Sequence, residues 1–437
     1  MGRADPSEKT DGDEISGVAL TPCPKTANVI EGTEPEQGHG EDVFLLQTRY
    51  RVLAGACLTQ FSIIGLLFSY GVFFKPLQDT FDWSRTFLSS ASALSFFMMG
   101  VLAILAGRLN DRFGPRIVLG VAGTVYGIGF LLLSQVSAPW HMYVIFGLFL
   151  GMGLGAHDVV TLSTIARWFP GRRGIMSGVV KSGTAIGQIV LPPFAALLLL
   201  AYGWRQALFL LGIGAIVLLV LAALMMSRPP PPTGAARDAL SEGQSFAQAR
   251  VTRVFWSLCA VQFLFFPAMM TVPLHVAVHG SDLGMSATKA ASLLSVLGAG
   301  SIAGRLIVGL ISDRIGGKRA FVMCFVVLLS SLIAFTLFTT HLLLFVIVAA
   351  YGFSHGGLFT VVSPLVAEYY GMRAHGAIFG TILFFGTLGG AIGPIVAGRI
   401  FDVTGSYQFA FMGLAGLAAL GLVLVISLPK PRLTAKV

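Results

Sequence analysis

The sequence predicts an all-α membrane protein with twelve transmembrane helices arranged as two six-helix repeats. Of its 437 residues, 55% are hydrophobic and only 11% are charged, and the mean hydropathy is +0.81. Soluble domains carry about 25% charged residues, so the composition excludes an ordinary soluble domain. Two further observations support the prediction: apolar runs of membrane-spanning length recur along the chain, and the second half repeats a pattern of the first.

Each apolar run is about 20 residues long, which is enough to cross the hydrocarbon core of a bilayer. The twelve runs lie near residues 51–74, 86–107, 117–137, 141–166, 174–199, 205–226, 254–279, 288–311, 320–339, 341–367, 375–400 and 407–428. A polar stretch with four consecutive prolines separates the sixth run from the seventh and is typical of a linker. The predicted divisions are a tail, a first bundle, a cytoplasmic linker, a second bundle and a short cytoplasmic tail, at 1–48, 49–226, 227–252, 253–428 and 429–437.

The N-terminal tail differs in charge from the rest of the chain. Residues 1–48 hold ten of the twenty acidic residues and only three basic ones. The tail is rich in Gly, Pro and Glu and has no apolar core of the kind that signal peptides carry. We therefore expect a disordered acidic cytoplasmic extension.

A repeat at a constant offset of 202 residues relates the two halves. Five positions of the first half return in the second: Gly107, Asp111, Arg112, Gly114 and Arg116 correspond to Gly309, Asp313, Arg314, Gly316 and Lys318. An offset held without gaps over several helices is typical of a duplicated unit. An even number of crossings per unit makes the two copies parallel repeats about an axis along the membrane normal.

Basic residues gather on one predicted side of the membrane, among them Arg108, Arg167, Arg173, Arg253 and Arg373. The positive-inside rule places this side, and with it both termini, in the cytoplasm. We expect a multi-pass protein of the plasma membrane.

Arg305 lies within an apolar run, 290–311, that is long enough to span the bilayer. A guanidinium cannot shed its proton, so this position is costly unless it faces water, a counter-charge or an anionic ligand. The sequence therefore favours an anion site. The alternative is an arginine that reaches the cytoplasmic edge of the membrane or that joins two helices.

Two more charges are predicted at the same depth, Asp158 in the fourth helix and Lys181 in the fifth. They lie about equally far on either side of the turn near Phe169, so they can meet. Arg305 and Lys181 are each about 10–12 Å of helical rise from a helix end on the same side. Protonation of Asp158 would raise the charge of this layer from +1 to +2 and tighten anion binding, as proton symport requires. A permanent Asp158–Lys181 pair that ties the hairpin together is the structural alternative.

Aromatic residues and histidines are predicted to line the same cavity. His157 and Phe359 are related by the 202-residue offset, and His355 lies one helical turn from Phe359. Either histidine could carry a proton or donate to a carboxylate, although packed histidines are the commoner case. Phe68 and Phe359 favour a substrate with some apolar body.

The repeated loop sequences carry a family resemblance. G-R-L-N-D-R-F-G-P-R at 107–116 and G-L-I-S-D-R-I-G-G-K-R at 309–319 resemble the loop signature of the major facilitator superfamily. The resemblance implies the major facilitator fold and a cytoplasmic latch formed by charge pairing between the halves. It implies gating roles for Gly107, Asp111, Arg112, Gly114, Arg116, Gly309, Asp313, Arg314 and Gly316. The alternative is a solvated loop that only sets the topology.

A narrower resemblance covers most of 61–407. Y-G-V-F-F-K-P-L-Q at 70–78, H-V-A-V-H-G-S-D-L-G at 275–284 and F-D-V-T-G-S-Y at 401–407 are similar to bacterial monocarboxylate-transporter-like proteins, close to the oxalate/formate antiporter family. Arg305 falls where that group places its substrate-binding arginine, which implies a carboxylate ligand. Other charges of such carriers are replaced here by Phe68, Ser301 and Gly386. Proton coupling is therefore expected at other residues, namely Asp158 and Lys181.

The combined prediction is a secondary active transporter of small organic anions, a proton-coupled monocarboxylate symporter that works by alternating access. The alternatives are a carboxylate exchanger of the oxalate/formate type, a multidrug efflux carrier, a non-transporting sensor and a membrane enzyme. No Walker motif, metal triad or Ser/His/Asp cluster appears at membrane depth. The expected partners are a small carboxylate, protons and the lipid bilayer, with no nucleic acid, no cofactor and no metal. The carrier is expected to function as a monomer.

Overall fold

The computed structural model describes residues 37–83, 85–230 and 243–431, and every regular element in this part of the chain is helical. The first half contains α1 (Gln37–Ser69), η1 (Tyr70–Phe73), α2 (Phe74–Phe81), α3 (Arg85–Phe113), α4 (Pro115–Leu133), α5 (Pro139–Val144), η2 (Ile145–Leu150), α6 (Gly151–Trp168) and α7 (Arg173–Met225). The remainder contains α9 (Phe246–Ala249), α10 (Arg253–Asp282), α11 (Ala287–Ile315), α12 (Gly317–Leu337), α13 (His341–Tyr370), α14 (His375–Thr404) and α15 (Gln408–Ser427).

All twelve predicted apolar runs are helical, although the described residues contain eleven separate spans that are long and apolar enough to cross a membrane. The difference lies in α7, whose 53 residues include the fifth and sixth runs. The break between these two runs is at Gly203, where φ is 75°. Glycine adopts this backbone conformation readily, whereas it is strained for residues that have a side chain. Gly405, which is 202 residues further on, ends α14 with a φ of 68°. The predicted fold class is confirmed.

Helix boundaries differ from the apolar runs. α1 begins at Gln37, so residues 37–48, which the sequence assigned to the tail, are helical. The rest of the predicted tail, 1–36, lies outside the described residues, as does 231–242 of the predicted linker. By its internal contacts the chain divides into two units, residues 1–45 and residues 46–437, and the boundary falls within α1. Hydropathy detects only the apolar part of a helix, so the polar residues before an apolar run can be helical without contributing to that signal.

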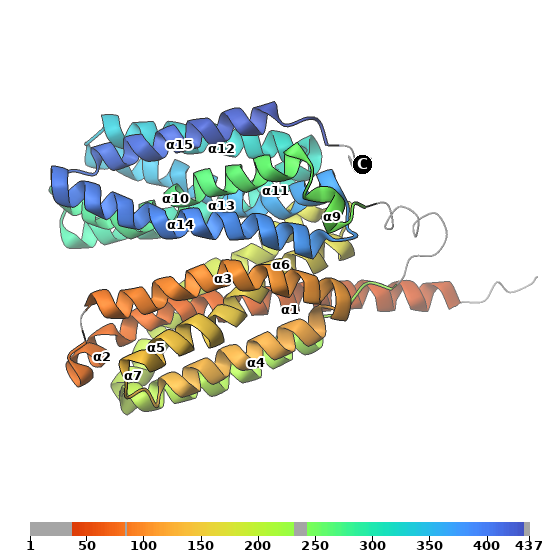
Figure 1. The fold of residues 1–437 in the computed structure, drawn as a ribbon, viewed down its shortest axis with the longest axis horizontal. Helices are drawn as coiled ribbons and strands as arrows, with labels where there is room; N and C mark the ends of the chain where they lie inside the picture. Colours follow the sequence, from red (N-terminus) through yellow and green to blue (C-terminus); the bar gives the residue numbers. More distant parts are fainter. Residues whose placement is uncertain (1–36, 84, 231–242, 432–437) are drawn as a thin grey trace, which may run out of the picture. The chain divides into compact units, whose positions relative to one another are not determined.

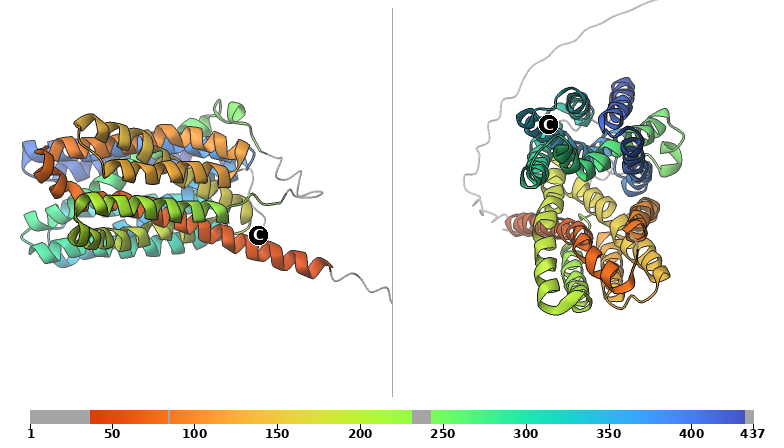
Figure 2. Two further views of the ribbon diagram at one scale, coloured as in Figure 1. Left: turned by 90° about the horizontal axis from the view of Figure 1, so that it is seen from below. Right: turned by 90° about the vertical axis from the view of Figure 1, so that its left-hand side faces the viewer.

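Within residues 46–437 the helices form two groups, α1–α7 and α10–α15 (Figures 1 and 2). In the first group α4 packs on α7 and α3 packs on α6, while in the second α11 packs on α13 and α10 packs on α14. Two pairs of helices make the most extensive contacts between the groups: α3 with α14, and α7 with α11. The 202-residue offset relates α3 to α11 and α7 to α14, so the two pairs are equivalent contacts. We call them the two seams.

Large apolar side chains are found both in the core and on the surface. Tyr126, Phe130, Phe265 and Phe325 are fully buried in the two largest hydrophobic clusters of the described residues. By contrast, Leu200 is 84% exposed, and many other leucines, isoleucines and valines are more than a third exposed. Extensive apolar surface on long helices is what a bilayer solvates. The fold therefore presents this surface to lipid and leaves its buried polar groups to the interior of the helix groups.

Candidate functional site

Asp158 of α6 and Lys181 of α7 form an ion pair in the interior of the first helix group. The Lys181 Nζ lies 2.6 Å from Oδ1 and 2.9 Å from Oδ2 of Asp158, so the ammonium donates to both oxygens. The two side chains are only 5% and 8% exposed. The sequence-based prediction that these residues meet across the hairpin is confirmed. In membrane interiors such charges are retained when they are paired, as here.

Polar side chains that the sequence did not single out complete this network. Gln60 of α1 donates from Nε2 to Asp158 Oδ1 at 2.8 Å and to Thr161 Oγ1 at 3.0 Å. Its Oε1 accepts from Thr184 Oγ1 at 2.8 Å. The only signal in the sequence is a glutamine inside an apolar run, which is unusual in a membrane span.

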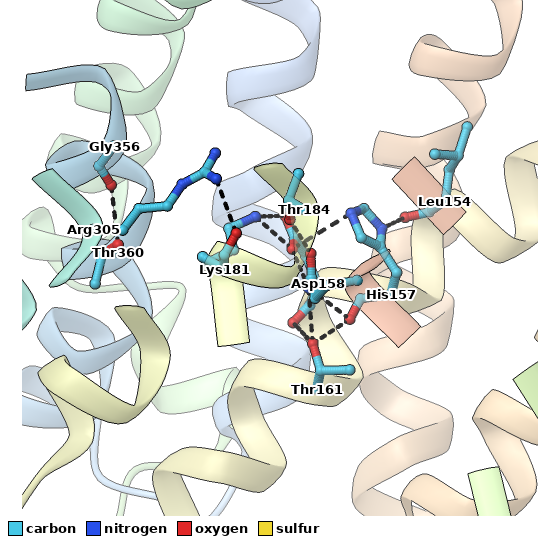
Figure 3. A network of polar contacts seen from close by, with 10 residues as sticks. Leu154, His157, Asp158, Thr161, Lys181, Thr184, Arg305, Gly356 and Thr360 are labelled. Carbon is cyan, nitrogen blue, oxygen red and sulfur yellow. Dashed lines mark hydrogen bonds and ion pairs between the residues drawn. The ribbon is translucent and has the colours of Figure 1, made fainter. Parts of the chain in front are cut away.

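Arg305 of α11 reaches the same region from the second helix group (Figure 3). It is 4% exposed, and its Nη1 donates to the backbone oxygen of Lys181 at 2.9 Å, across the α7–α11 seam. Among the described residues, the Nε of Arg305 has no hydrogen-bond partner. The guanidinium forms no ion pair within the described part of the chain. We call Asp158, Lys181 and Arg305 the charged layer.

The seam is tight where Arg305 crosses it. A Cβ added to Gly178 would lie 2.1 Å from the backbone oxygen of Arg305, so only glycine permits this approach of α7 to α11. The close contact explains why the arginine, although it belongs to the other helix group, can reach the backbone of Lys181.

His157, His355 and Phe359 lie around the charged layer. The Nε2 of His157 lies 3.5 Å from Asp158 Oδ1, and its Nδ1 is hydrogen-bonded to the backbone oxygen of Leu154. The ring of Phe359 lies 5.3 Å from Lys181 Nζ, a cation–π distance, and packs edge-on against His355. Three of the four predicted lining residues, His157, His355 and Phe359, therefore lie beside the charges.

Phe68, the fourth residue predicted to line the cavity, does not lie beside the charged layer. It is 53% exposed and lies eight residues beyond Gln60 on α1, which corresponds to about 12 Å along the helix. Hydropathy and family position gave no information about which way this side chain faces.

The two acids of the repeated signature make equivalent contacts across the seams. Asp313, near the end of α11, accepts from the backbone N–H groups of Gly174 and Ile175 at 2.6 and 2.9 Å. Asp111, near the end of α3, accepts from the N–H of Ala377 at 3.2 Å. Each carboxylate thus caps the first turn of a helix in the opposite group, where unpaired N–H groups and the helix dipole favour an anion. We call these two contacts the caps.

The resemblance implied charge pairing between the halves, and this stays a prediction. The arginine that pairs with Asp111, Arg167 at 2.6 Å, belongs to the same half. At the other cap, Asp313 of the second half interacts electrostatically with Arg172 and Arg173 of the first half. Arg167 also donates a 3.4 Å hydrogen bond across the seam, to the backbone oxygen of Met372. The predicted loop residues are also at helix ends, because α3 and α11 continue through the signature.

The signature glycines have two separate structural roles. An added Cβ at Gly107 would lie 2.1 Å from the backbone oxygen of Gly376, and one at Gly309 would lie 2.6 Å from that of Gly174. These glycines therefore permit close packing at the seams. Two later glycines end α3 and α11 with φ near 90°, a conformation that disfavours side chains: Gly114 and Gly316.

The signature arginines lie elsewhere. Three of them are exposed on the surface, and in the described structure they are not brought to the contact between the halves: Arg112, Arg116 and Arg314. The gating role that the resemblance implied for Arg112, Arg116 and Arg314 stays a prediction.

Comparison with known proteins identifies the family. Residues 56–339 and 276–437 match the Major Facilitator Superfamily. The chain is 27% identical to monocarboxylate transporter 13 of Rattus norvegicus over 394 residues, which cover 87% of this chain and 89% of that protein. It is also 27% identical to monocarboxylate transporter 11 of Homo sapiens over 423 residues, which cover 94% of this chain and 87% of that protein.

Two solved structures have the same fold. The Escherichia coli fucose:proton symporter FucP superposes with a TM-score of 0.68 at 15% identity, over 88% of this chain and 98% of that chain. The proton:xylose symporter XylE superposes with a TM-score of 0.72 at 16% identity, over 88% of this chain and 96% of that chain. The family match extends over most of the sequence. The chain therefore belongs to the major facilitator superfamily and is a multi-pass membrane transporter.

Proposed function

We propose that this transporter is a secondary active carrier of small organic anions, and specifically a proton-coupled monocarboxylate symporter that works by alternating access. The observation that carries the proposal is the state of Arg305. Its guanidinium is buried, is not paired with an acid in the described structure, and keeps Nε without a partner. A carboxylate offers two oxygens to such a planar fork, which is the strongest common way to satisfy it. The similarity to proteins named monocarboxylate transporters supports this ligand class.

Asp158 and Lys181 are the proposed coupling pair. When Asp158 is ionised, it neutralises Lys181 and leaves the positive charge of Arg305 for one carboxylate. A proton on Asp158 releases the ammonium of Lys181 from its partner, so the layer then offers two cations to the substrate. Substrate and proton therefore favour each other's binding, which is the thermodynamic requirement for symport. Phe359, His355 and His157 supply the proposed wall of the site, and Phe68 is proposed to contact the apolar part of the substrate outside the charged layer.

Alternating access is proposed to use the two seams. The caps of Asp111 and Asp313 and the close contacts of Gly107 and Gly309 hold one end of the molecule closed. We propose that this end is cytoplasmic, with both termini on the same side of the plasma membrane, because the basic residues gather there. The bundles 49–226 and 253–428 would then rock about the charged layer, and one chain supplies every part, so a monomer suffices.

The test is uptake by proteoliposomes that contain the full-length protein. A panel of labelled monocarboxylates, dicarboxylates and one lipophilic cation is offered with an inward proton gradient, without a gradient, and with internal unlabelled anion. We expect a monocarboxylate to accumulate only with the proton gradient and a protonophore to abolish accumulation. Uptake that requires internal anion would identify an exchanger instead. Transport of the lipophilic cation alone would overturn the proposal.

A further inference from the structure

Gln60 is a fully buried amide with both of its ends engaged. It lies on α1, whereas its partners are Asp158 and Thr161 on α6 and Thr184 on α7. The side chain is 0% exposed, so each of these hydrogen bonds replaces one to water that it cannot make. Three helices therefore meet at one amide group.

The hydrogen bonds fix which way the amide faces. The hydroxyl of Thr161 donates to the backbone oxygen of His157, so it can only accept from Gln60. The NH₂ group must therefore face Thr161 and Asp158, and the amide oxygen must accept from Thr184. In this orientation Gln60 can donate to Asp158 but cannot accept from it.

We infer that Gln60 is a positioning residue that holds the carboxylate of Asp158 ionised against Lys181 and ties that ionised form to α1. The donor is oriented toward Oδ1, the same oxygen that Lys181 approaches at 2.6 Å. An ionised carboxylate oxygen is a stronger acceptor for this N–H group than the oxygen of a neutral acid, so the amide favours the charged form. The other charged or titratable groups that face Asp158 are Lys181 from α7, Arg305 from α11 and its neighbour His157.

The role in transport rests on the proposed proton coupling by Asp158. Within that function, protonation of Asp158 would weaken the hydrogen bond from Gln60 and loosen the junction of α1, α6 and α7. Because α1 also packs closely on α7, where an added Cβ at Gly65 would lie 2.6 Å from the backbone oxygen of Gly187, such a release would be felt along both helices.

Gln60→Leu tests the inference, because leucine has a similar size and no donor. The full-length protein in detergent is titrated by infrared difference spectroscopy, and the C=O band of the protonated Asp158 is assigned by its absence in Asp158→Asn. We expect the titration midpoint of Gln60→Leu to move to higher pH by about one unit, a tenfold change in proton affinity. The pH profile of proteoliposome uptake should move in the same direction.

Thr59→Val is the matched control. Thr59 is the neighbouring residue on α1, is 1% exposed, and bonds the backbone oxygen of Gly55 in its own helix at 2.9 Å. This variant should titrate like the wild type. If Gln60→Leu does not fold, Gln60→Met serves as the second variant, because methionine is also similar in size and has no donor, and it should move the midpoint in the same direction.

The two possible failures can be told apart. An unchanged midpoint in a folded Gln60→Leu or Gln60→Met protein overturns the inference, even if the wild type accumulates substrate with the proton gradient. A shifted midpoint in a protein that shows no gradient-driven accumulation supports the role of Gln60 at Asp158 and overturns the proposed symport.

Discussion

Arg305 differs from the other two charges of the layer in what its donors contact. Lys181 has a carboxylate, whereas Arg305 has one backbone oxygen and an Nε without a partner in the described structure. We expect Arg305→Lys and Arg305→Ala both to reduce saturable uptake by tenfold or more, because lysine keeps the charge but loses the planar fork. Equilibrium binding in detergent checks that the loss is in affinity. Arg319→Lys, at an exposed position on α12, is the control. Normal uptake by folded Arg305→Ala would exclude it as the anchor.

Asp158 carries a second prediction at this scale. Asp158→Asn keeps the size of the side chain and one acceptor oxygen but cannot gain or lose a proton near neutral pH. We expect it to abolish accumulation driven by a proton gradient and to retain exchange of labelled for unlabelled anion, because exchange needs no net proton movement. Both activities are measured in the same proteoliposomes. Accumulation at the wild-type level would place coupling elsewhere, with His157 and His355 as the next candidates.

Part of the site could be predicted from single residues and part could not. The depth of Asp158 and Lys181 could be counted from the turn between their helices, so their contact followed from helical geometry. The hydrogen bonds of Gln60 depend on how α1 is rotated and placed against two other helices, and hydropathy contains neither quantity. The same missing information separates Phe359, which lies beside Lys181, from Phe68, which does not.

A prediction about the helix contacts concerns the two caps, Asp111 and Asp313. Asp111→Asn and Asp313→Asn keep an acceptor for the helix N–H groups but remove the charge that the helix dipole favours, which is worth about 0.3–1 kcal/mol at a typical site. We expect slower or unbalanced turnover with an equilibrium affinity for substrate that changes by less than about tenfold. The measurements are turnover in proteoliposomes and binding in detergent. Loss of binding by a folded variant would contradict a gating role.

Element types followed from the sequence, but element ends did not. Apolar runs identify spans because the bilayer requires a fixed length of apolar helix. Where a helix ends depends on local backbone geometry, as at Gly203, where two runs of α7 meet at a positive φ. The continuation of α3 and α11 through the signature changed the interpretation of Asp111 and Asp313 from loop residues to helix caps.

We expect the seams to control how the whole molecule opens, and a substitution at Gly380 tests this away from the charged layer. An added Cβ at Gly380 of α14 would lie 2.5 Å from the backbone oxygen of Ala103 in α3. We expect Gly380→Leu to favour the conformation in which the signature end is open, by about tenfold or more, because overpacking typically costs 1–3 kcal/mol. The control is Gly398→Leu on the same helix, where an added Cβ has no atom within 4 Å.

Electron–electron distance measurements can follow this opening. Nitroxide labels are placed at Ile117→Cys and Arg319→Cys, two exposed positions near the signature end of opposite halves, with the native cysteines replaced. The distance distribution should lengthen for Gly380→Leu and stay at the wild-type value for Gly398→Leu. An unchanged distribution in Gly380→Leu would show that this seam does not control opening.

The 202-residue repeat predicted the duplication, yet it could not show which helices of the two copies would touch. That information is in the caps, where the acid of each copy meets a helix start of the other. Such an interface is isologous: one unit offers both the carboxylate and the backbone amides, and its twin offers the same pair in return. Each copy of the six-helix unit therefore holds both complementary parts of this contact, whereas the charged layer is divided unequally, with the acid and the lysine in the first copy and the arginine in the second.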